Sequence, residues 1–169
     1  MVNHSVFPSV SNKENPFRWY LGSGQPILAS RAFFEEQRSP LRHDWFFFAT
    51  TGTPAENNIF SFGIFIPYED VDLLEKTYTL ANGLSFIHGH SKPEWYGAQD
   101  SFLAEKKAEL SVRLDRIKGT AVGDFNGEIT TDCYQLKLTG TFDFSLTSGP
   151  RSESGKTSRK EHFEQISKM

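Results

Sequence analysis

Two segments near the end of the chain alternate strictly between apolar and polar residues, and this alternation limits the fold more than any other feature. In residues 109–115 the apolar positions are Leu110, Val112 and Leu114, and every position between them is polar or charged. In residues 134–146 every second residue is apolar except Gly140. Side chains of a strand point alternately to its two faces. Each segment therefore predicts an antiparallel strand with one buried face and one solvated face.

Further strand segments precede these two. Apolar runs on either side of Gly22–Gly24 indicate a hairpin, and so do the runs 45–52 and 59–66, which 53–58 separates. The segment 60–66 is apolar on both faces and predicts a central strand covered on both sides. The segment 84–90 is also read as a strand. Glycines interrupt residues 119–129, which favours an edge or bulged strand there.

Helix signals are few. Residues 70–75 suggest a short helical turn, residues 102–110 a short helix, and residues 161–167 a last helical turn. Aromatic residues make up 14% of the chain, with 16 Phe against 2 Met, which favours strands over helix bundles. We therefore expect an all-β fold: a single-domain antiparallel β-sandwich, or a flattened barrel, of about eight or nine strands with little helix. The expected domain is 17–147, between a flexible segment 1–16 and a polar, disordered tail 148–169.

Charge, cysteine content and the first residues of the chain indicate its compartment and which classes of partner to expect. The formal net charge of −3 gives no field that would attract nucleic acid. Cys133 is the sole cysteine, so no intramolecular disulfide forms, which suits a reducing compartment. Residues 1–16 lack the features of a signal peptide, and no apolar run is long enough to span a bilayer. The sequence thus predicts a soluble, cytoplasmic protein with no nucleic-acid or membrane partner.

The stretch "FIHGHSKPEWYG", residues 86–97, is the best candidate for a ligand site. His88 and His90 are one residue apart on a predicted strand, so both imidazoles would leave the same face and bind one divalent metal ion. Glu94 or Asp100 would complete such a site, and His43 is a further candidate from elsewhere. The competing interpretation is a strand end with two partly exposed histidines, in which Gly89 introduces a bend that separates the rings.

The same stretch also fits a small glycan. Trp95 and Tyr96 offer aromatic rings for stacking, and His90, Glu94 and Asp100 offer partners for hydroxyl groups. The alternative is structural, with Trp95 folding back to cap the core.

Catalytic signatures are absent from the sequence. It contains no Gly-x-Ser-x-Gly motif, and Cys133 is expected to be structural because no histidine is linked to it in sequence. The glycines of "LGSGQ", residues 21–25, lack the lysine and the following helix of a phosphate-binding loop. These observations favour a non-catalytic protein that needs no cofactor.

The order of short motifs resembles a known group of proteins. The segment "AELSVRLDRIKGT" is a charged alternating strand that enters a Gly-Thr turn, and "IKGTAVGDF" and "LTGTFDFSL" repeat a Gly-Thr-strand pattern. Over residues 17–146 this order is similar to small uncharacterised bacterial β-sandwich proteins, often lipoprotein-like. The resemblance implies a β-sandwich with a non-enzymatic role and no catalytic residues. The chain departs from that group because it lacks their signal peptide and lipid-attachment cysteine.

Two functional hypotheses follow. The first is a non-catalytic binding or protein-interaction module that uses sheet edges or end loops. Its partner would be another protein or a second copy, because phenylalanines on edge strands such as "WFFFA", residues 45–49, would favour association. The second is a metal- or carbohydrate-binding protein, in one version an enzyme, with its site at His88, His90, Glu94, Trp95 and Tyr96.

Overall fold

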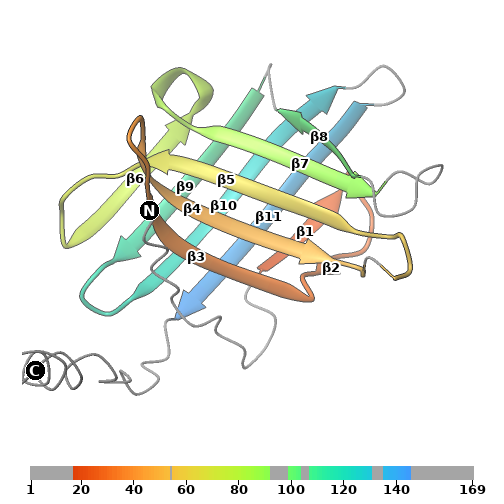
Figure 1. Ribbon diagram of the computed structural model, residues 1–169, viewed down its shortest axis with the longest axis horizontal. Helices are drawn as coiled ribbons and strands as arrows, with labels where there is room; N and C mark the ends of the chain where they lie inside the picture. The colour runs from red at the N-terminus through yellow and green to blue at the C-terminus, as the bar shows by residue number, and fades with distance from the viewer. Residues whose placement is uncertain (1–16, 54, 92–98, 104–106, 131–134, 146–169) are drawn as a thin grey trace, which may run out of the picture.

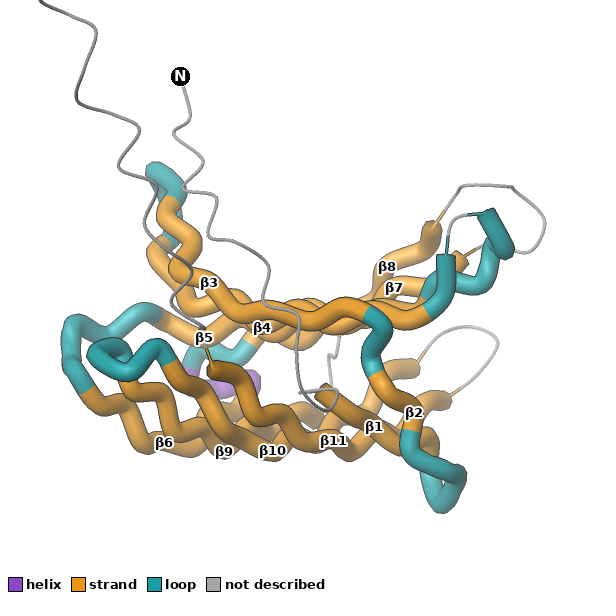
Figure 2. The backbone as a smooth tube through the Cα atoms, turned by 90° about the horizontal axis from the view of Figure 1, so that it is seen from below, coloured by secondary structure: helices purple, strands orange, loops and turns teal. Residues whose placement is uncertain are grey.

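The computed structural model describes residues 17–53, 55–91, 99–103, 107–130 and 135–145, and for 99–103 it describes the backbone only. These residues form two antiparallel sheets packed face to face, so the predicted all-β sandwich is confirmed (Figures 1 and 2). The described part of the chain has eleven strands, more than the eight or nine expected, because strands shorter than about six residues leave little signal in sequence.

One sheet has six strands in the order β2-β1-β11-β10-β9-β6. Its members are β1 (Phe17–Leu21), β2 (Ile27–Leu28), β6 (Leu73–Thr79), β9 (Lys107–Asp115), β10 (Thr120–Thr130) and β11 (Gln135–Ser145). The other sheet has five strands in the order β3-β4-β5-β7-β8. Its members are β3 (Arg31–Arg38), β4 (His43–Thr51), β5 (Phe60–Pro67), β7 (Ser85–Ser91) and β8 (Gln99–Leu103).

The chain passes between the sheets at short corners. At the first of these, the Ala29 amide donates to the carbonyl of Phe17 in β1, and the Ser30 amide donates to that of Thr50 in β4. The adjacent residues Ala29 and Ser30 thus bond to strands of different sheets. A second passage follows β5, and a third contains the 3-10 turn η1 (Leu80–Asn82) between β6 and β7. Figure 1 shows the strands of the two sheets crossing rather than running parallel, as corner-connected sheets do.

Aromatic rings from both sheets meet in the space between them. Phe47 of β4 lies 5.0 Å from Phe142 of β11, and Phe62 of β5 lies 5.1 Å from Trp19 of β1, both measured between ring centroids. All four side chains are buried. The high phenylalanine content therefore supplies the core, because flat rings fill the narrow space between two pleated surfaces.

The predictions for the alternating segments are confirmed. In β9, Leu110, Val112 and Leu114 are buried, whereas Glu109 and Arg113 are exposed. In β11 the buried side chains are Leu138, Phe142 and Phe144. The two predicted hairpins exist as the β1–β2 and β4–β5 pairs.

The prediction of an edge or bulged strand over 119–129 is wrong, because β10 lies inside the six-stranded sheet between β9 and β11. Its glycines have a packing role. Gly123 is paired with Phe142 and Gly140 with Phe125, and each phenylalanine ring lies over the glycine opposite. A Cβ on Gly123 would meet the Phe142 ring at 2.6 Å. The glycines are therefore the places where large rings fit against the backbone.

Other expectations also differ from the structure. Residues 70–72 form a loop and β6 begins at Leu73, so there is no helical turn at 70–75. Strands β8 and β9 occupy most of 102–110, where a helix was expected. Among the described residues η1 is the sole helical element, so none of their helices is long enough to cross a membrane. The predictions for 1–16, Cys133 and 148–169, including the turn at 161–167, lie outside the described residues.

The predictions for the two phenylalanine-rich runs are confirmed only in part. Strand β5 is the central strand of its sheet, as predicted, but its outer face is not fully covered, since Phe65 is partly exposed. The run 45–49 lies in β4, which is not an edge strand, because β3 covers its free side. The phenylalanines of 45–49 are consequently presented on a sheet face instead of an edge.

Candidate functional site

His88 and His90 lie on the inner face of β7, as the alternation predicted. Their ring centroids are 5.4 Å apart and their planes are inclined by 23°, so the predicted separation of the rings at Gly89 is wrong. His88 is fully buried against Phe60, with 4.2 Å between the ring centroids, and its Nδ1 lies 3.3 Å from the carbonyl oxygen of Ser61. The expectation of two partly exposed rings is thus wrong for His88. His90 is partly exposed.

Burial decides the protonation state of His88. Because the imidazolium would lose its hydration, the pKa of His88 falls from 6.5 to about 4, although the contact with the Ser61 carbonyl opposes this shift and the neighbouring His90 adds to it. His88 is therefore neutral near pH 7. A neutral imidazole can pack among aromatic rings or bind a metal ion.

For the remaining residues of the predicted site, the structure describes no side chains. Glu94, Trp95 and Tyr96 lie in 92–98, outside the described residues, and Asp100 is paired in register with His90 without its side chain being described. In the part of the chain with described side chains, no group of three or more His, Cys, Asp and Glu residues could hold a metal ion. The metal and glycan hypotheses for 86–100 both stay predictions.

His43 does not join His88 and His90. His90 pairs with Phe60, which pairs with Thr51, so His90 lies level with the far end of β4 from His43. Eight residues of strand separate the two levels, a distance of roughly 26 Å. His43 instead stacks on Tyr68 with 3.7 Å between ring centroids, and its Nε2 lies 2.7 Å from a carboxylate oxygen of Glu36.

The surface that the structure reveals is the outer side of the five-stranded sheet. We call it the phenylalanine face, and it comprises the partly exposed side chains Phe33, Phe46, Phe48, Phe65 and Ile87. They come from β3, β4, β5 and β7, four adjacent strands. In Figure 2 this face is the upper surface of the upper layer.

The rings of the phenylalanine face are in mutual contact. Phe46 stacks on Phe65 with a centroid distance of 4.4 Å, and Phe33 lies 5.2 Å from Phe48 and 6.0 Å from Phe46. Gly63 lies between the rings, and a Cβ there would meet Phe46 at 3.1 Å. The four rings thus form one contiguous apolar patch, and Ile87 pairs in register with Gly63 on the neighbouring strand.

Charged side chains border this patch. The Arg31 guanidinium lies 5.6 Å from the Phe33 ring centroid, and the Arg42 guanidinium lies 5.9 Å from that of Phe65. Glu35 pairs in register with Phe46 and supplies a negative charge. An apolar centre with a charged margin of both signs is the usual composition of a protein-binding surface.

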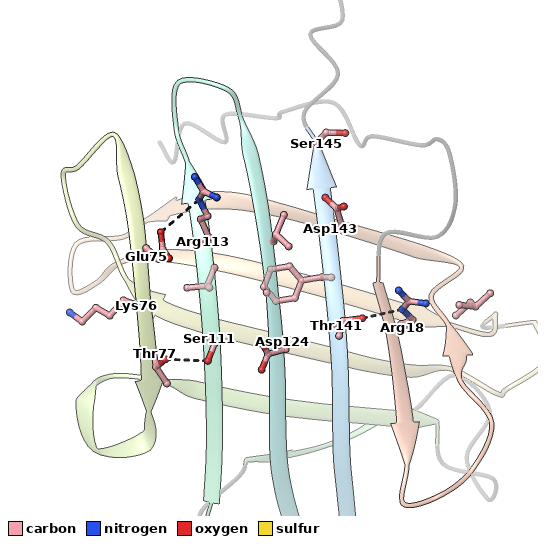
Figure 3. Close-up of a pocket in the computed structure, with 15 residues that line it drawn as sticks. Arg18, Glu75, Lys76, Thr77, Ser111, Arg113, Asp124, Thr141, Asp143 and Ser145 are labelled. Atoms are coloured by element: carbon pink, nitrogen blue, oxygen red, sulfur yellow. Dashed lines mark hydrogen bonds and ion pairs between the residues drawn. The ribbon is translucent and has the colours of Figure 1, made fainter.

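The outer face of the six-stranded sheet has the opposite character (Figure 3). One row across it consists of Arg18, Thr141, Asp124, Ser111 and Thr77, one residue from each of five strands. Arg18 donates to the Thr141 hydroxyl at 3.0 Å, and the hydroxyls of Thr77 and Ser111 are 3.1 Å apart. This row crosses a shallow hollow of about 1160 Å³. With mixed charges and hydroxyl groups, the hollow resembles an ordinary solvated sheet face.

No protein-family model, curated protein or solved structure matches this chain. The resemblance to bacterial β-sandwich proteins stays a prediction.

The phenylalanine face is not among the sites predicted from the sequence, although the sequence contains a signal for it. The runs "FF" at 33–34, "WFFF" at 45–48 and "IFI" at 64–66 are apolar at consecutive positions. Consecutive apolar residues in a strand must place apolar side chains on both faces. Since the core can bury one face of each strand in a two-layer sandwich, the other face had to be exposed or covered by a partner.

Proposed function

We propose that this protein is a non-catalytic protein-interaction module whose docking surface is the phenylalanine face. A single observation carries the proposal: four phenylalanine rings form a contiguous patch, with Ile87 on the neighbouring strand, on the solvent side of a sheet whose other side already packs against the second sheet. The core does not need these side chains for its own closure. Large contiguous apolar patches on a soluble domain are typical of interaction sites.

The composition of the patch supports a protein as its partner. Interface centres are enriched in aromatic residues and arginine and poor in other charged groups, and the charges collect at the margin. The phenylalanine face follows this division, with Arg31, Arg42 and Glu35 at its margin. The complementary surface is therefore an apolar protein patch bordered by charges of both signs.

The edge strands β3 and β6 are less suited to this role. The C-terminal half of the edge strand β3 carries Glu35, Glu36 and Arg38. The edge strand β6 carries Glu75 and Lys76. Charged residues on an edge oppose the addition of another strand, because pairing would bring their charges close to the new neighbour. The face offers apolar contact without this cost.

The test uses a photo-crosslinking amino acid at position 48, with position 122 on the polar outer face as the matched control. Val122 is also apolar and exposed, at 47%. Any protein captured from position 48 in the producing cell, a second copy included, is purified and titrated against the wild type, Phe48→Ser and Val122→Ser. We expect saturable binding to the wild type and to V122S, and binding at least about tenfold weaker to F48S.

Two results would contradict the proposal. One is capture from position 122 alone, or from neither position. The other is equal affinity of the captured protein for F48S and the wild type. Circular dichroism of F48S shows whether the variant keeps its fold, and Phe46→Ser provides a second variant of the same patch.

A further inference from the structure

We propose that the partner of the phenylalanine face is a second copy of this chain, so that two five-stranded sheets pack face to face in a symmetric dimer. The inference rests on the proposed function and names its partner. Charge placement, the order of residues across the sheet and the size of the face each support it.

The margin of the face carries two opposite charges on one strand. Arg31 and Glu35 both lie on the outward side of β3, with Phe33 between them. Arg31 forms no ion pair with another described residue. The Glu35 carboxylate accepts a hydrogen bond from the Gln37 amide at 3.0 Å but has no cationic partner among the described residues. A partner that offers a carboxylate near Arg31 and a cation near Glu35 would satisfy both.

A second copy offers this pattern. Consider a twofold axis that crosses the strands at the level of Phe33. It places Arg31 of each copy over Glu35 of the other, so that the same ion pair forms twice. In such an interface a patch must be complementary to itself, and two opposite charges equally far from the axis meet that condition.

The apolar residues follow the same symmetry. Phe33 pairs in register with Phe48, Phe48 with Gly63, and Gly63 with Ile87. These four residues form one row across four strands, and the proposed axis runs along this row. The row of one copy therefore lies on the same row of the other, apolar on apolar. Like-charged contacts do not arise at the centre, because the row contains no charge.

The face is large enough for a stable contact. The four strands of the face, spaced about 4.8 Å apart and about eight residues long, cover roughly 19 by 26 Å, or about 500 Å², before side-chain relief is counted. A standard protein interface buries about 800 Å² on each partner. The sheet face alone supplies most of that area.

The first measurement is sedimentation velocity of the full chain at concentrations from about 1 to 200 µM. We expect a monomer–dimer equilibrium for the wild type and for V122S. The dimer dissociation constant of F48S should rise by at least about tenfold. A wild type that stays monomeric throughout overturns the inference. So does an F48S dimer as stable as that of the wild type, because that dimer would use another surface.

A charge exchange tests the symmetry itself. The single variants Arg31→Glu and Glu35→Arg each create two like-charged contacts in their own dimer, so each should dimerise at least about tenfold more weakly than the wild type. Mixing the two variants restores both unlike pairs, and we expect heterodimers at close to wild-type affinity. Arg18→Glu on the polar outer face is the control and should leave dimerisation unchanged. Weak homodimers with no recovery on mixing would contradict the proposed axis.

The two proposals fail in different ways. If the wild type is monomeric while position 48 captures a different protein whose binding F48S weakens, the second copy is the wrong partner and the interaction module stands. If the wild type is monomeric and position 48 captures nothing, both proposals fail.

Discussion

At the residue scale, His88 shows how a polar side chain is accommodated in a phenylalanine core. Its ring contacts Phe60 and Phe62, with centroid distances of 4.2 and 5.7 Å, and its Nδ1 faces the Ser61 carbonyl. Only the neutral form tolerates this environment, which is why the pKa of His88 falls to about 4. The free energy of unfolding consequently depends on pH through His88, although this residue is neutral near pH 7.

The sign of this linkage follows from the two pKa values. The unfolded chain binds a proton at His88 near pH 6.5 and the folded chain near pH 4, so the unfolded state is favoured as pH falls between these values. Between pH 7.5 and 5 the wild type should lose about 2 kcal/mol of its free energy of unfolding through this residue. Urea denaturation at both pH values measures the loss. The variant His88→Leu should lose about 2 kcal/mol less, and an identical pH dependence in the two proteins would contradict the assignment.

At the scale of elements, β10 and β11 are held together by reciprocal ring-over-glycine contacts. Phe125 of β10 covers Gly140 of β11, and Phe142 of β11 covers Gly123 of β10. A glycine normally weakens a strand, since it adds no side chain to the sheet. Here the facing rings occupy the space that its side chain would have taken. The two phenylalanine rings and the two glycines that they cover accordingly form one continuous surface.

This arrangement predicts opposite outcomes for two Gly→Ala substitutions. In Gly140→Ala the new Cβ would overlap the Phe125 ring and lie 2.7 Å from the Arg18 carbonyl oxygen, so we expect a loss of about 1–3 kcal/mol. In Gly127→Ala, also on β10–β11, the nearest atom would be 3.7 Å away, an ordinary contact. That variant should be neutral or gain about 0.5 kcal/mol. Thermal unfolding of both variants checks the contrast, and equal stabilities would contradict it.

Element positions were predictable wherever one face of a strand meets water. The alternation in β9 and β11 reports which side is buried, because only that side is apolar. The sequence does not report which strands are neighbours, and for this reason the glycines of β10 wrongly predict an edge strand. The segment 102–110 has high helix propensity, but strand pairing takes precedence over it in the described residues of β8 and β9.

The candidate site was less predictable than the fold. The common face of His88 and His90 followed from their spacing, whereas the burial of His88 depends on Phe60 and Phe62 of a neighbouring strand. The phenylalanine face combines residues of four strands, and only their register brings them together. Register across several strands is a property of the folded molecule, which a single segment cannot reveal.

At the scale of the whole molecule, the inward rings join the two sheets into one unit. Phe142 of the six-stranded sheet contacts Phe47 of the five-stranded sheet at 5.0 Å, and Phe125 contacts Phe86 at 5.6 Å. Each sheet alone would expose one largely apolar face. The sheets should therefore unfold together.

The substitution Phe142→Ala tests this coupling. It removes a buried ring that also covers Gly123, so the free energy of unfolding should fall by about 3–5 kcal/mol. The exposed control Val122→Ala should change it by less than about 0.5 kcal/mol. Far-ultraviolet circular dichroism and tryptophan fluorescence should follow a single transition in both variants, since Trp19 and Trp45 lie in different sheets. Separate transitions would show that the sheets are independent.

The pairing of β1 with β11 also determines how the molecule carries mechanical load. Phe17, the first residue of β1, lies opposite Phe142, close to the end of β11 at Ser145. The chain thus enters and leaves the sandwich at the same end of two adjacent antiparallel strands. Tension applied through the two ends would break the hydrogen bonds between these strands one after another, as in a zip, instead of loading them all at once. Tension would therefore fall first on the hydrogen bonds between β1 and β11 of the six-stranded sheet, so the sandwich would yield at low force.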